Sequence, residues 1–359
     1  MSKLINSLKP SKKTVLRGLL IWIVCLLGAL CFTHFFIGSM LYKKYQVFLS
    51  SAEVSHQEVL TLIKDVHSQQ HETSAKTFLI LGIDELENRP GFPQLTDTMI
   101  LTKIDPQSAT VTSLSLPRDL WHEPYKTKIN ALYEYGKERY PNQPQKFPKE
   151  VLSEMTGIEI NTSIVISLNQ LGEIIDLLGG VMIDVKRGFT DHKFPRTDVD
   201  ILIERDPAKL YETITFEEGL QLMDGETALK YIRSRNSEDP QTGSDLARAD
   251  RQQQVISSLV STLTNKTFFW SYPEVIGQLF KYYQDNFSQY LSIKDLLVLG
   301  YNLMGNMDQL KLETVSLPIY PNNQDSFIKH PQNLSPYQQQ WVYIITDEAD
   351  FLHYFQTNF

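Results

Sequence analysis

Residues 77–84 are Thr77-Phe78-Leu79-Ile80-Leu81-Gly82-Ile83-Asp84, an apolar run that ends on an acid. A continuous apolar run of this length predicts a strand that is buried on both faces of a sheet. Two more strands are expected at 98–104 and 110–116, because the turn 105–108 separates them and Pro117 ends the second. These three strands predict a meander at the start of a folded domain.

The rest of the chain alternates helix and strand signals. Helices are expected at 149–155, 169–178, 224–230 and 246–263, and strands at 164–166, 181–185 and 312–317. The order strand, helix, strand over 164–185 predicts a right-handed parallel crossover. Residues 186–214 lack periodicity and are interpreted as an insertion. We therefore expect an α/β fold in which a mixed central β-sheet is flanked by helices.

The N-terminal region has the pattern of a membrane anchor. Residues 18–41 hold no charged side chain, and about 20 apolar residues suffice to span a bilayer as a helix. Five cations precede the run and no acid does, which favours a cytoplasmic N-terminus. We expect a cytoplasmic tail at 1–17, a single-pass transmembrane anchor at 18–41, a juxtamembrane stalk at 42–75 and an extracellular domain at 76–359. A cleaved signal peptide is the alternative.

Charge and cysteine content exclude several classes of protein. Without the five N-terminal cations, the chain keeps 29 Lys and Arg against 42 Asp and Glu, a net charge of −13. An acidic outer region argues against a nucleic-acid partner, and no helix-turn-helix signal is present. The two cysteines, Cys25 and Cys31, lie within the apolar run, so the outer region has no disulfide and no cysteine metal site.

Charged residues gather at one end of the predicted meander. If neighbouring strands are antiparallel, Asp84, Asp97, Arg118 and Asp119 all lie at the same rim of the sheet. Two carboxylates placed in this way suit an oxygen-binding cation such as Mg²⁺. The alternative is that these acids only cap loops at strand ends.

A second concentration is rich in arginine. On a helix over 246–263, Arg248 and Gln252 share a face with the apolar Val255 and Leu259, so they face the interior or a cleft. One guanidinium group can bind two phosphate oxygens at once, so a cluster of arginines favours a phosphate ligand. Ion pairs with local acids are the alternative. The arginines are Arg233, Arg235, Arg248 and Arg251, and the acids are Glu238, Asp239, Asp245 and Asp250.

Eight short motifs in this order resemble the LytR–CpsA–Psr family of bacterial cell-wall ligases, over most of residues 77–359. They are Leu81-Gly82-Ile83-Asp84, Thr96-Asp97-Thr98-Met99, Leu116-Pro117-Arg118-Asp119, Lys128-Ile129-Asn130-Ala131, Leu178-Gly179-Gly180-Val181, Gly225-Glu226-Thr227-Ala228-Leu229, Tyr231-Ile232-Arg233-Ser234-Arg235 and Asp245-Leu246-Ala247-Arg248-Ala249-Asp250-Arg251-Gln252. Each motif alone is weak, but their combination is specific.

The resemblance implies a Mg²⁺-dependent phosphotransferase on the outer face of the membrane. The family moves a phosphorylated glycan, such as teichoic acid or capsule, from a polyprenyl-pyrophosphate carrier to peptidoglycan. By matching motifs, Asp84 and Asp97 would hold Mg²⁺ or Mn²⁺. The pyrophosphate would be bound by Arg118, Arg233, Arg235, Arg248, Arg251 and Gln252. The catalytic candidates are Arg118, Asp119, Asp245 and Arg248.

Two positions depart from the family pattern. The family commonly has arginine where this chain has Leu86 and Leu95, and Arg89 is a candidate replacement for one of them. These differences keep two other functions open. One is a hydrolase that cleaves the same pyrophosphate with water, and the other is a lipid-binding, wall-organising protein with weakened catalysis.

Overall fold

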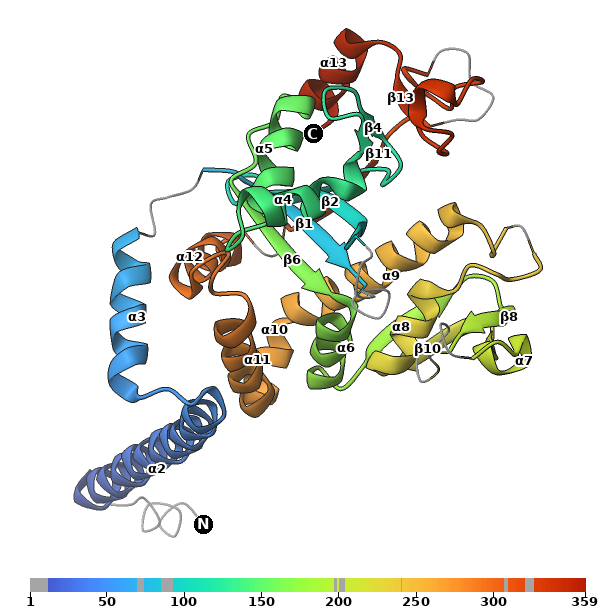
Figure 1. Cartoon of the computed structure of the whole chain (residues 1–359). Helices are drawn as coiled ribbons and strands as arrows, with labels where there is room; N and C mark the ends of the chain where they lie inside the picture. The colour runs from blue at the N-terminus through green and yellow to red at the C-terminus, as the bar shows by residue number, and fades with distance from the viewer. Residues whose placement is uncertain are drawn as a thin grey trace, which may run out of the picture.

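A mixed five-stranded sheet forms the centre of the molecule in a computed structural model, which describes residues 12–69, 74–84, 93–196, 199, 204–239, 241–306, 309–319 and 326–359 (Figure 1). The sheet order is β11-β3-β2-β1-β6. Neighbours β1, β2 and β3 are antiparallel, whereas β6 and β11 run parallel to β1 and β3. The strands are β1 (Lys76–Ile83), β2 (Thr96–Asp105), β3 (Thr110–Ser115), β6 (Thr162–Ser167) and β11 (Lys311–Ser316). The predicted meander and mixed sheet are confirmed.

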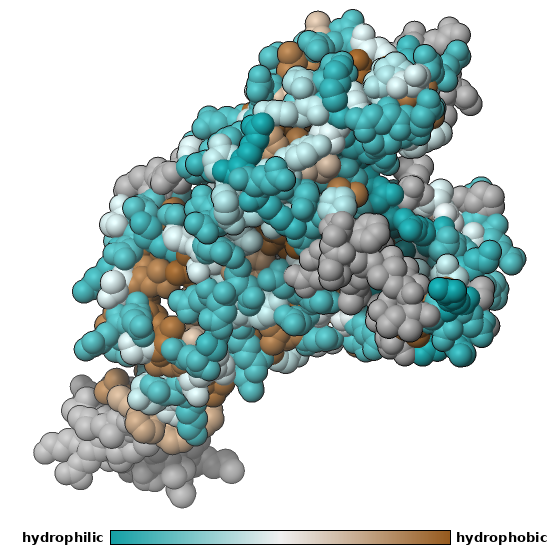
Figure 2. Space-filling model, in the orientation of Figure 1, coloured by the Kyte–Doolittle hydropathy of each residue, from teal (hydrophilic) through white to brown (hydrophobic). Residues whose placement is uncertain are grey.

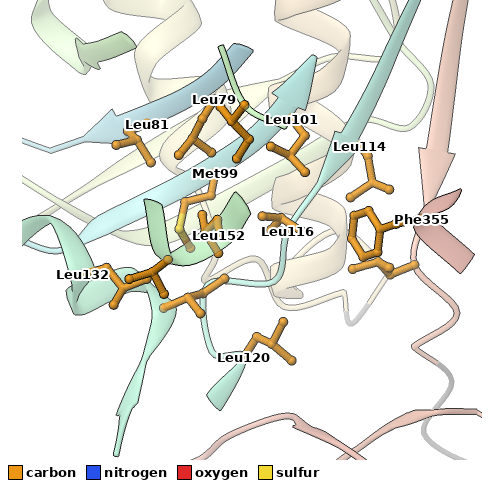
Figure 3. Packing of buried hydrophobic residues seen from close by; sticks show 14 of the residues in the cluster. Leu79, Leu81, Met99, Leu101, Leu114, Leu116, Leu120, Leu132, Leu152 and Phe355 are labelled. Carbon is orange, nitrogen blue, oxygen red and sulfur yellow. The ribbon is translucent and has the colours of Figure 1, made fainter. Parts of the chain in front are cut away.

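One face of this sheet carries the main hydrophobic core. Alternate residues of the strands, among them Leu79, Leu81, Met99, Leu101 and Leu114, are fully buried on this face (Figure 3). Three helices cover them, which are α4 (Leu132–Arg139), α5 (Lys146–Thr156) and α13 (Glu348–Asn358). Helix α5 ends at Gly157 with φ 68°, the left-handed conformation that glycine adopts readily at a helix C-terminus.

A second core lies under α6 (Leu168–Leu177), α8 (Gly225–Arg233) and α9 (Asp245–Thr264). Here the predicted parallel crossover is wrong. Strand β7 (Val181–Val185) pairs antiparallel with β10 (Gly219–Met223), in a separate two-stranded sheet, and not with β6. The reversal follows α6, where Gly179 and Gly180 have φ of 79° and 103°, a region that favours glycine and turns β7 away from the central sheet.

The predicted insertion contains regular structure. Strands β8 (Phe189–Pro195) and β9 (Tyr211–Phe216) form an antiparallel ribbon, and the short α7 (Pro207–Leu210) precedes β9. The inward residues Phe189, Phe194, Ile214 and Phe216 join the second core. The small elements of the chain are β4 (Trp121–His122), β5 (Thr127–Lys128), η3 (Ile129–Ala131), β12 (Ile328–Lys329), η5 (Ser335–Tyr337) and β13 (Ile344–Ile345).

The expected stalk is packed against the domain. Helix α2 (Lys12–Ala52) lies along α11 (Pro273–Asn286), where the rings of Phe48 and Phe280 are 5.9 Å apart. Helix α3 (His56–Gln69) lies beside α12 (Ile293–Met304), and α10 (Lys266–Ser271) precedes α11. Apolar residues gather between α3 and α11–α12 (Figure 2), around a cavity of about 620 Å³. No helix among the described residues is both long and apolar enough to cross a bilayer.

Candidate functional site

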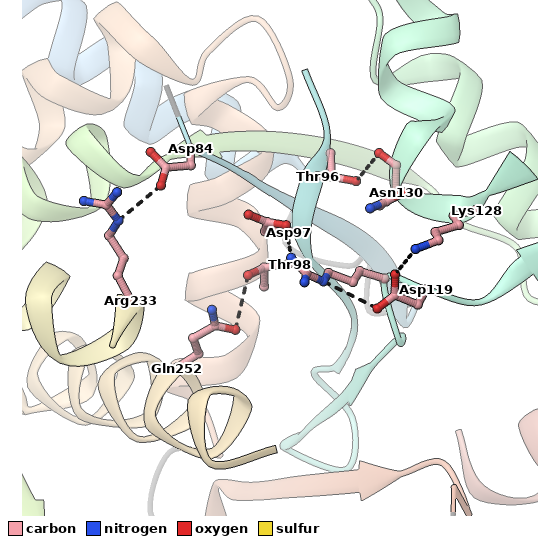
Figure 4. A network of polar contacts seen from close by, with 10 residues as sticks. Asp84, Thr96, Asp97, Thr98, Asp119, Lys128, Asn130, Arg233 and Gln252 are labelled. Carbon is pink, nitrogen blue, oxygen red and sulfur yellow. Dashed lines mark hydrogen bonds and ion pairs between the residues drawn. The ribbon is translucent and has the colours of Figure 1, made fainter. Parts of the chain in front are cut away.

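The ends of three strands bring the predicted acids and Arg118 together. Asp84 follows β1 directly, and Arg118 follows β3 by three residues. The pairing of β1 with β2 shifts between Gly82 and Ile83, so that Asp97 is the extra residue of a β-bulge. A bulge re-aims a side chain at a sheet edge. The Nη1 atom of Arg118 is 2.5 Å from Oδ1 of Asp97 (Figure 4).

Glycine at position 82 allows the side chain of Thr98 on β2 to pack closely against β1. A Cβ at Gly82 would lie 2.9 Å from the Cβ of Thr98 on the neighbouring strand, closer than such atoms come. The hydroxyl of Thr98 in turn donates to Oε1 of Gln252 at 3.2 Å. The bare backbone at position 82 therefore leaves room for Thr98, whose hydroxyl contacts Gln252 of α9.

Helices α8 and α9 supply the basic side of the site. Each helix begins after a residue whose side chain caps its N-terminus, Asp224 for α8 and Ser244 for α9. The cap sets the first residue of the helix and therefore the direction in which each later side chain points. Arg233 ends α8, and its Nε is 3.1 Å from Oδ2 of Asp84, a side chain that is only 8% exposed. The guanidinium of Arg233 also lies over the ring of Phe194, at 5.7 Å from the ring centre.

Most of these side chains line one pocket, although Arg118 is not among its lining residues. Its polar residues come from β1, β2, α8 and α9, and its apolar wall includes Phe194 and Ile232. The free space is about 50 Å³, enough for a few water-sized groups. The polar residues are Asp84, Asp97, Thr98, Arg233, Arg235, Arg248 and Gln252. The structure thus brings together residues up to 168 positions apart that the sequence assigned to one site.

The ion pairs in the pocket cross between segments. Arg233 pairs with Asp84 and Arg118 with Asp97, so both predicted metal ligands face guanidinium groups. The local acid Asp239 instead pairs with Arg187, away from the pocket. The pair of Arg233 with Asp84 joins the two concentrations of charge that the sequence singled out, whereas the pair of Arg118 with Asp97 lies within the first of them. Among the described residues, no group of three or more His, Cys, Asp or Glu side chains is arranged as a complete metal cage.

Arg251 does not line the pocket, contrary to the expectation that it binds the pyrophosphate. It is 4% exposed, and its guanidinium donates to the carbonyls of Tyr231 and Thr242 at 2.8 Å, and to that of Ser234. Burial lowers its pKa, and its ring neighbours Phe189 and Tyr231 stack against the cation. Arg251 therefore fixes the end of α8, from which Arg233 projects.

Asp191 is a buried acid that sequence reasoning missed. It is fully buried on β8 and accepts hydrogen bonds from the hydroxyl of Ser234 at 2.7 Å and from the backbone N–H groups of Arg235 and Asn236. It therefore shapes the loop that carries Arg235. Alternation with the buried Phe189 placed Asp191 on the inward face of the strand, and a buried acid needs partners.

The remaining predicted residues have different positions. Asp119 accepts a hydrogen bond from Nζ of Lys128 at 2.6 Å and lies 3.6 Å from Nε of Arg118, so it anchors that arginine. The side chain of Asp245 lies outside the described part of the chain, as do Leu86 and Arg89. Leu95 is described and is 38% exposed.

Known proteins resemble this chain in sequence and in fold. A model of the LytR_cpsA_psr family matches residues 42–341. The polyisoprenyl-teichoic acid–peptidoglycan teichoic acid transferase TagU of Oceanobacillus iheyensis is 25% identical over 293 residues, 79% of this chain and 76% of that protein. The transferase of the same name from Bacillus subtilis is 22% identical over 311 residues, 85% of this chain and 87% of that protein.

Solved structures agree on the fold. The crystal structure of TagV from B. subtilis has a TM-score of 0.54 at 18% identity, covering 80% of this chain and 96% of that one. A structure of TagT bound to LIIa-WTA has a TM-score of 0.51 at 18% identity, covering 80% and 90%. The names of the sequence relatives agree with the predicted class of enzyme, a transferase of wall polymers. With a family model that spans most of its length, the chain belongs to the LytR–CpsA–Psr family.

Proposed function

We propose that the chain transfers a phosphorylated glycan from a polyprenyl-pyrophosphate carrier to peptidoglycan. One observation carries the proposal, which is that Arg233, Arg235, Arg248 and Gln252 line the same pocket as Asp84 and Asp97. Three guanidinium groups at one cavity suit a doubly charged diphosphate. The sequence relatives are transferases of teichoic acid to peptidoglycan, which supports a wall glycopolymer as the group transferred.

The carboxylates fit a divalent cation in this scheme. Mg²⁺ is commonly held by one or two carboxylates together with waters and substrate phosphates, so Asp84 and Asp97 need no third protein ligand. Once bound, the ion would neutralise charge on the diphosphate. Arg233 and Arg118, which now pair with these acids, would then be available to phosphate oxygens.

The chain itself contributes binding and charge. A sugar hydroxyl of the acceptor attacks the phosphorus that carries the glycan, the bond to the bridging oxygen breaks, and polyprenyl phosphate leaves while the hydroxyl proton passes to a base. Arg233 and Arg248 stabilise the charge that develops on the phosphate oxygens, which is the main protein contribution in phosphoryl transfer. Lys128 and Asp119 hold Arg118 in position for the same task.

We further propose that residues 18–41 anchor the protein in the membrane, with the domain outside the cell. Apolar side chains of α2 such as Trp22, Phe32, Phe35 and Phe36 are more than half exposed, as suits contact with lipid. A substrate with a polyprenyl tail lies in the same bilayer, so the anchor would keep the site beside it.

The test is a transfer assay with the full chain, lipid-linked glycan, Mg²⁺ and soluble peptidoglycan chains. Arg248→Ala is expected to lower the transfer rate roughly 100-fold, the usual effect of losing a charge-stabilising donor. Arg187→Ala is the matched control, because Arg187 pairs with Asp239 outside the pocket and its loss should leave the rate unchanged. If free phosphoglycan is released at a rate that does not depend on peptidoglycan, the chain is a hydrolase and the transferase proposal is wrong.

A further inference from the structure

The C-terminal segment is attached directly to the loop that carries Arg118. The backbone N–H of Tyr343 donates to the carbonyl of Asp119 at 2.9 Å, and the N–H of Trp121 donates to the carbonyl of Tyr343 at 2.7 Å. Tyr343 thereby forms a parallel bridge with Leu120, and in Figure 1 the segment around β13 lies beside β4. Whatever the segment binds is held next to the proposed reaction centre.

The C-terminal segment carries an exposed tryptophan side chain, that of Trp341. Trp341 is 56% exposed, and its ring stacks on that of His330 with 3.6 Å between the ring centres and 19° between the planes. His330 is itself fixed, because its Nδ1 lies 2.9 Å from the carbonyl oxygen of the buried Val342. The ring of Tyr343 is 6.5 Å from the indole and nearly perpendicular to it. Trp341 is therefore a rigid and accessible flat surface.

Three glutamines, Gln338, Gln339 and Gln340, directly precede Trp341 in the chain. Gln338 and Gln339 both have positive φ, 57° and 59°, which is uncommon outside glycine and costly where it occurs. The amide of Gln340 donates to Oε1 of Gln338 at 3.2 Å. Strained backbone kept at an exposed turn supports a role in binding, and amides both donate and accept hydrogen bonds.

The segment is also neutral. Residues 330–341 contain no Asp, Glu, Lys or Arg, in a chain of which 21% is charged. A charged ligand such as the diphosphate has its place in the arginine-lined pocket, whose lining includes Asp97, the ion-pair partner of Arg118. Neutral amides beside a flat aromatic ring suit an uncharged ligand with many hydroxyl or amide groups.

We propose that Trp341 and the amides beside it bind a sugar ring of the acceptor glycan, the peptidoglycan chain. This proposal rests on the proposed function and assigns its acceptor subsite. One face of a pyranose ring presents C–H groups, whose partial positive charge is attracted to the negative face of an indole. Hydroxyl and acetamido groups at the ring edge find partners in Gln338 and Gln340. The sugar would then be held beside Asp119 and Arg118, where its neighbour in the chain offers the attacking hydroxyl.

The experiment measures acceptor and donor kinetics of the full chain, and separately the sedimentation of the chain with insoluble, glycan-only peptidoglycan strands. Trp341→Ala should raise the KM for the acceptor about 10-fold, a typical effect of truncating an aromatic anchor. The kcat and the KM for the lipid-linked donor should stay within about twofold. Trp341→Phe should keep most of the acceptor affinity that Trp341→Ala loses. Gln340→Ala should have a lower acceptor affinity than the wild type.

Trp270→Ala is the control, since Trp270 is 66% exposed and lies on α10, outside the C-terminal segment. An unchanged acceptor KM in Trp341→Ala, with the melting temperature preserved, would overturn the proposal. A rise in the donor KM instead would assign the indole to the donor glycan and would also overturn it. The sedimentation readout separates this proposal from the proposed function, because loss of strand binding in Trp341→Ala supports the subsite even if no transfer is detected.

Discussion

At the scale of single residues, Arg251 has a structural task that differs from that of its neighbours. Its guanidinium donates to three backbone carbonyls, those of Tyr231, Ser234 and Thr242, and its charge is buried. Arg251→Met should lower the free energy of unfolding by about 3 kcal/mol, because it leaves buried carbonyls without donors. Chemical denaturation of the full chain measures this, and an Arg251→Met protein as stable as the wild type would contradict the assignment.

His122 is a second residue with a specific effect on stability. Burial lowers its pKa against the opposing charges of Glu154 and Glu123, and its Nδ1 has no hydrogen-bond partner. The neutral form is thus preferred in the folded state, while the unfolded state titrates near 6.5. The contribution of neutral His122 to the free energy of unfolding is therefore fully present above about pH 6.5. It is lost as the pH falls from there through the lowered pKa of the folded state.

His122→Phe removes this titration and the unpaired nitrogen. Between pH 7 and pH 5 its melting temperature should fall less than that of the wild type, because the unfolded state no longer gains a proton at this position. Differential scanning fluorimetry over this range is sufficient. Parallel pH profiles for the two proteins would show that His122 does not titrate on unfolding.

At the scale of elements, the contact between α2 and α11 depends on Gly277. A Cβ at this position would lie 2.7 Å from the Cβ of Ser51 and 2.8 Å from the carbonyl oxygen of Phe48. Gly277→Val should therefore push the helices apart and cost roughly 1–3 kcal/mol. The ion pair of Lys281 on α11 with Glu53, the residue after α2, spans 2.8 Å near the surface and contributes less.

Limited proteolysis of the full chain detects this separation. Cleavage between α2 and α3, around residue 54, should become faster in Gly277→Val. Gly300→Val is a matched control in α12, because a Cβ at Gly300 meets no atom within 4 Å. Equal cleavage rates in Gly277→Val and Gly300→Val would argue that the two helices do not depend on close packing.

The elements also show which features a sequence can predict. Arg248 and Gln252 were placed correctly at the pocket because helical periodicity is local and depends only on their own helix. The partner of β7 was not predicted, because the alternating pattern of a strand does not specify which strand it pairs with. Its partner, β10, lies more than 30 residues later in the chain. Arg251 was assigned to the ligand because spacing does not reveal that the carbonyls of Tyr231, Ser234 and Thr242 occupy its donors.

At the scale of the whole molecule, the two cores meet at the site. The central sheet supplies the carboxylates and the lobe of α8 and α9 supplies most of the guanidinium groups, so the pocket exists only when the two lobes are packed together. The ion pair between Arg233 and Asp84 is one of the contacts that joins them. Binding of an anion and a cation at this junction should stabilise the folded chain.

Calorimetric titration of the full chain with a short-chain polyprenyl pyrophosphate in Mg²⁺ tests the common anion site most directly. Binding is expected in the wild type and in Arg187→Ala, and Arg248→Ala should weaken it about 100-fold through loss of a charge-assisted, two-pronged contact. Asp97→Asn should remove the dependence of the affinity on Mg²⁺. Equal affinity in wild type and Arg248→Ala, with or without Mg²⁺, would contradict the account.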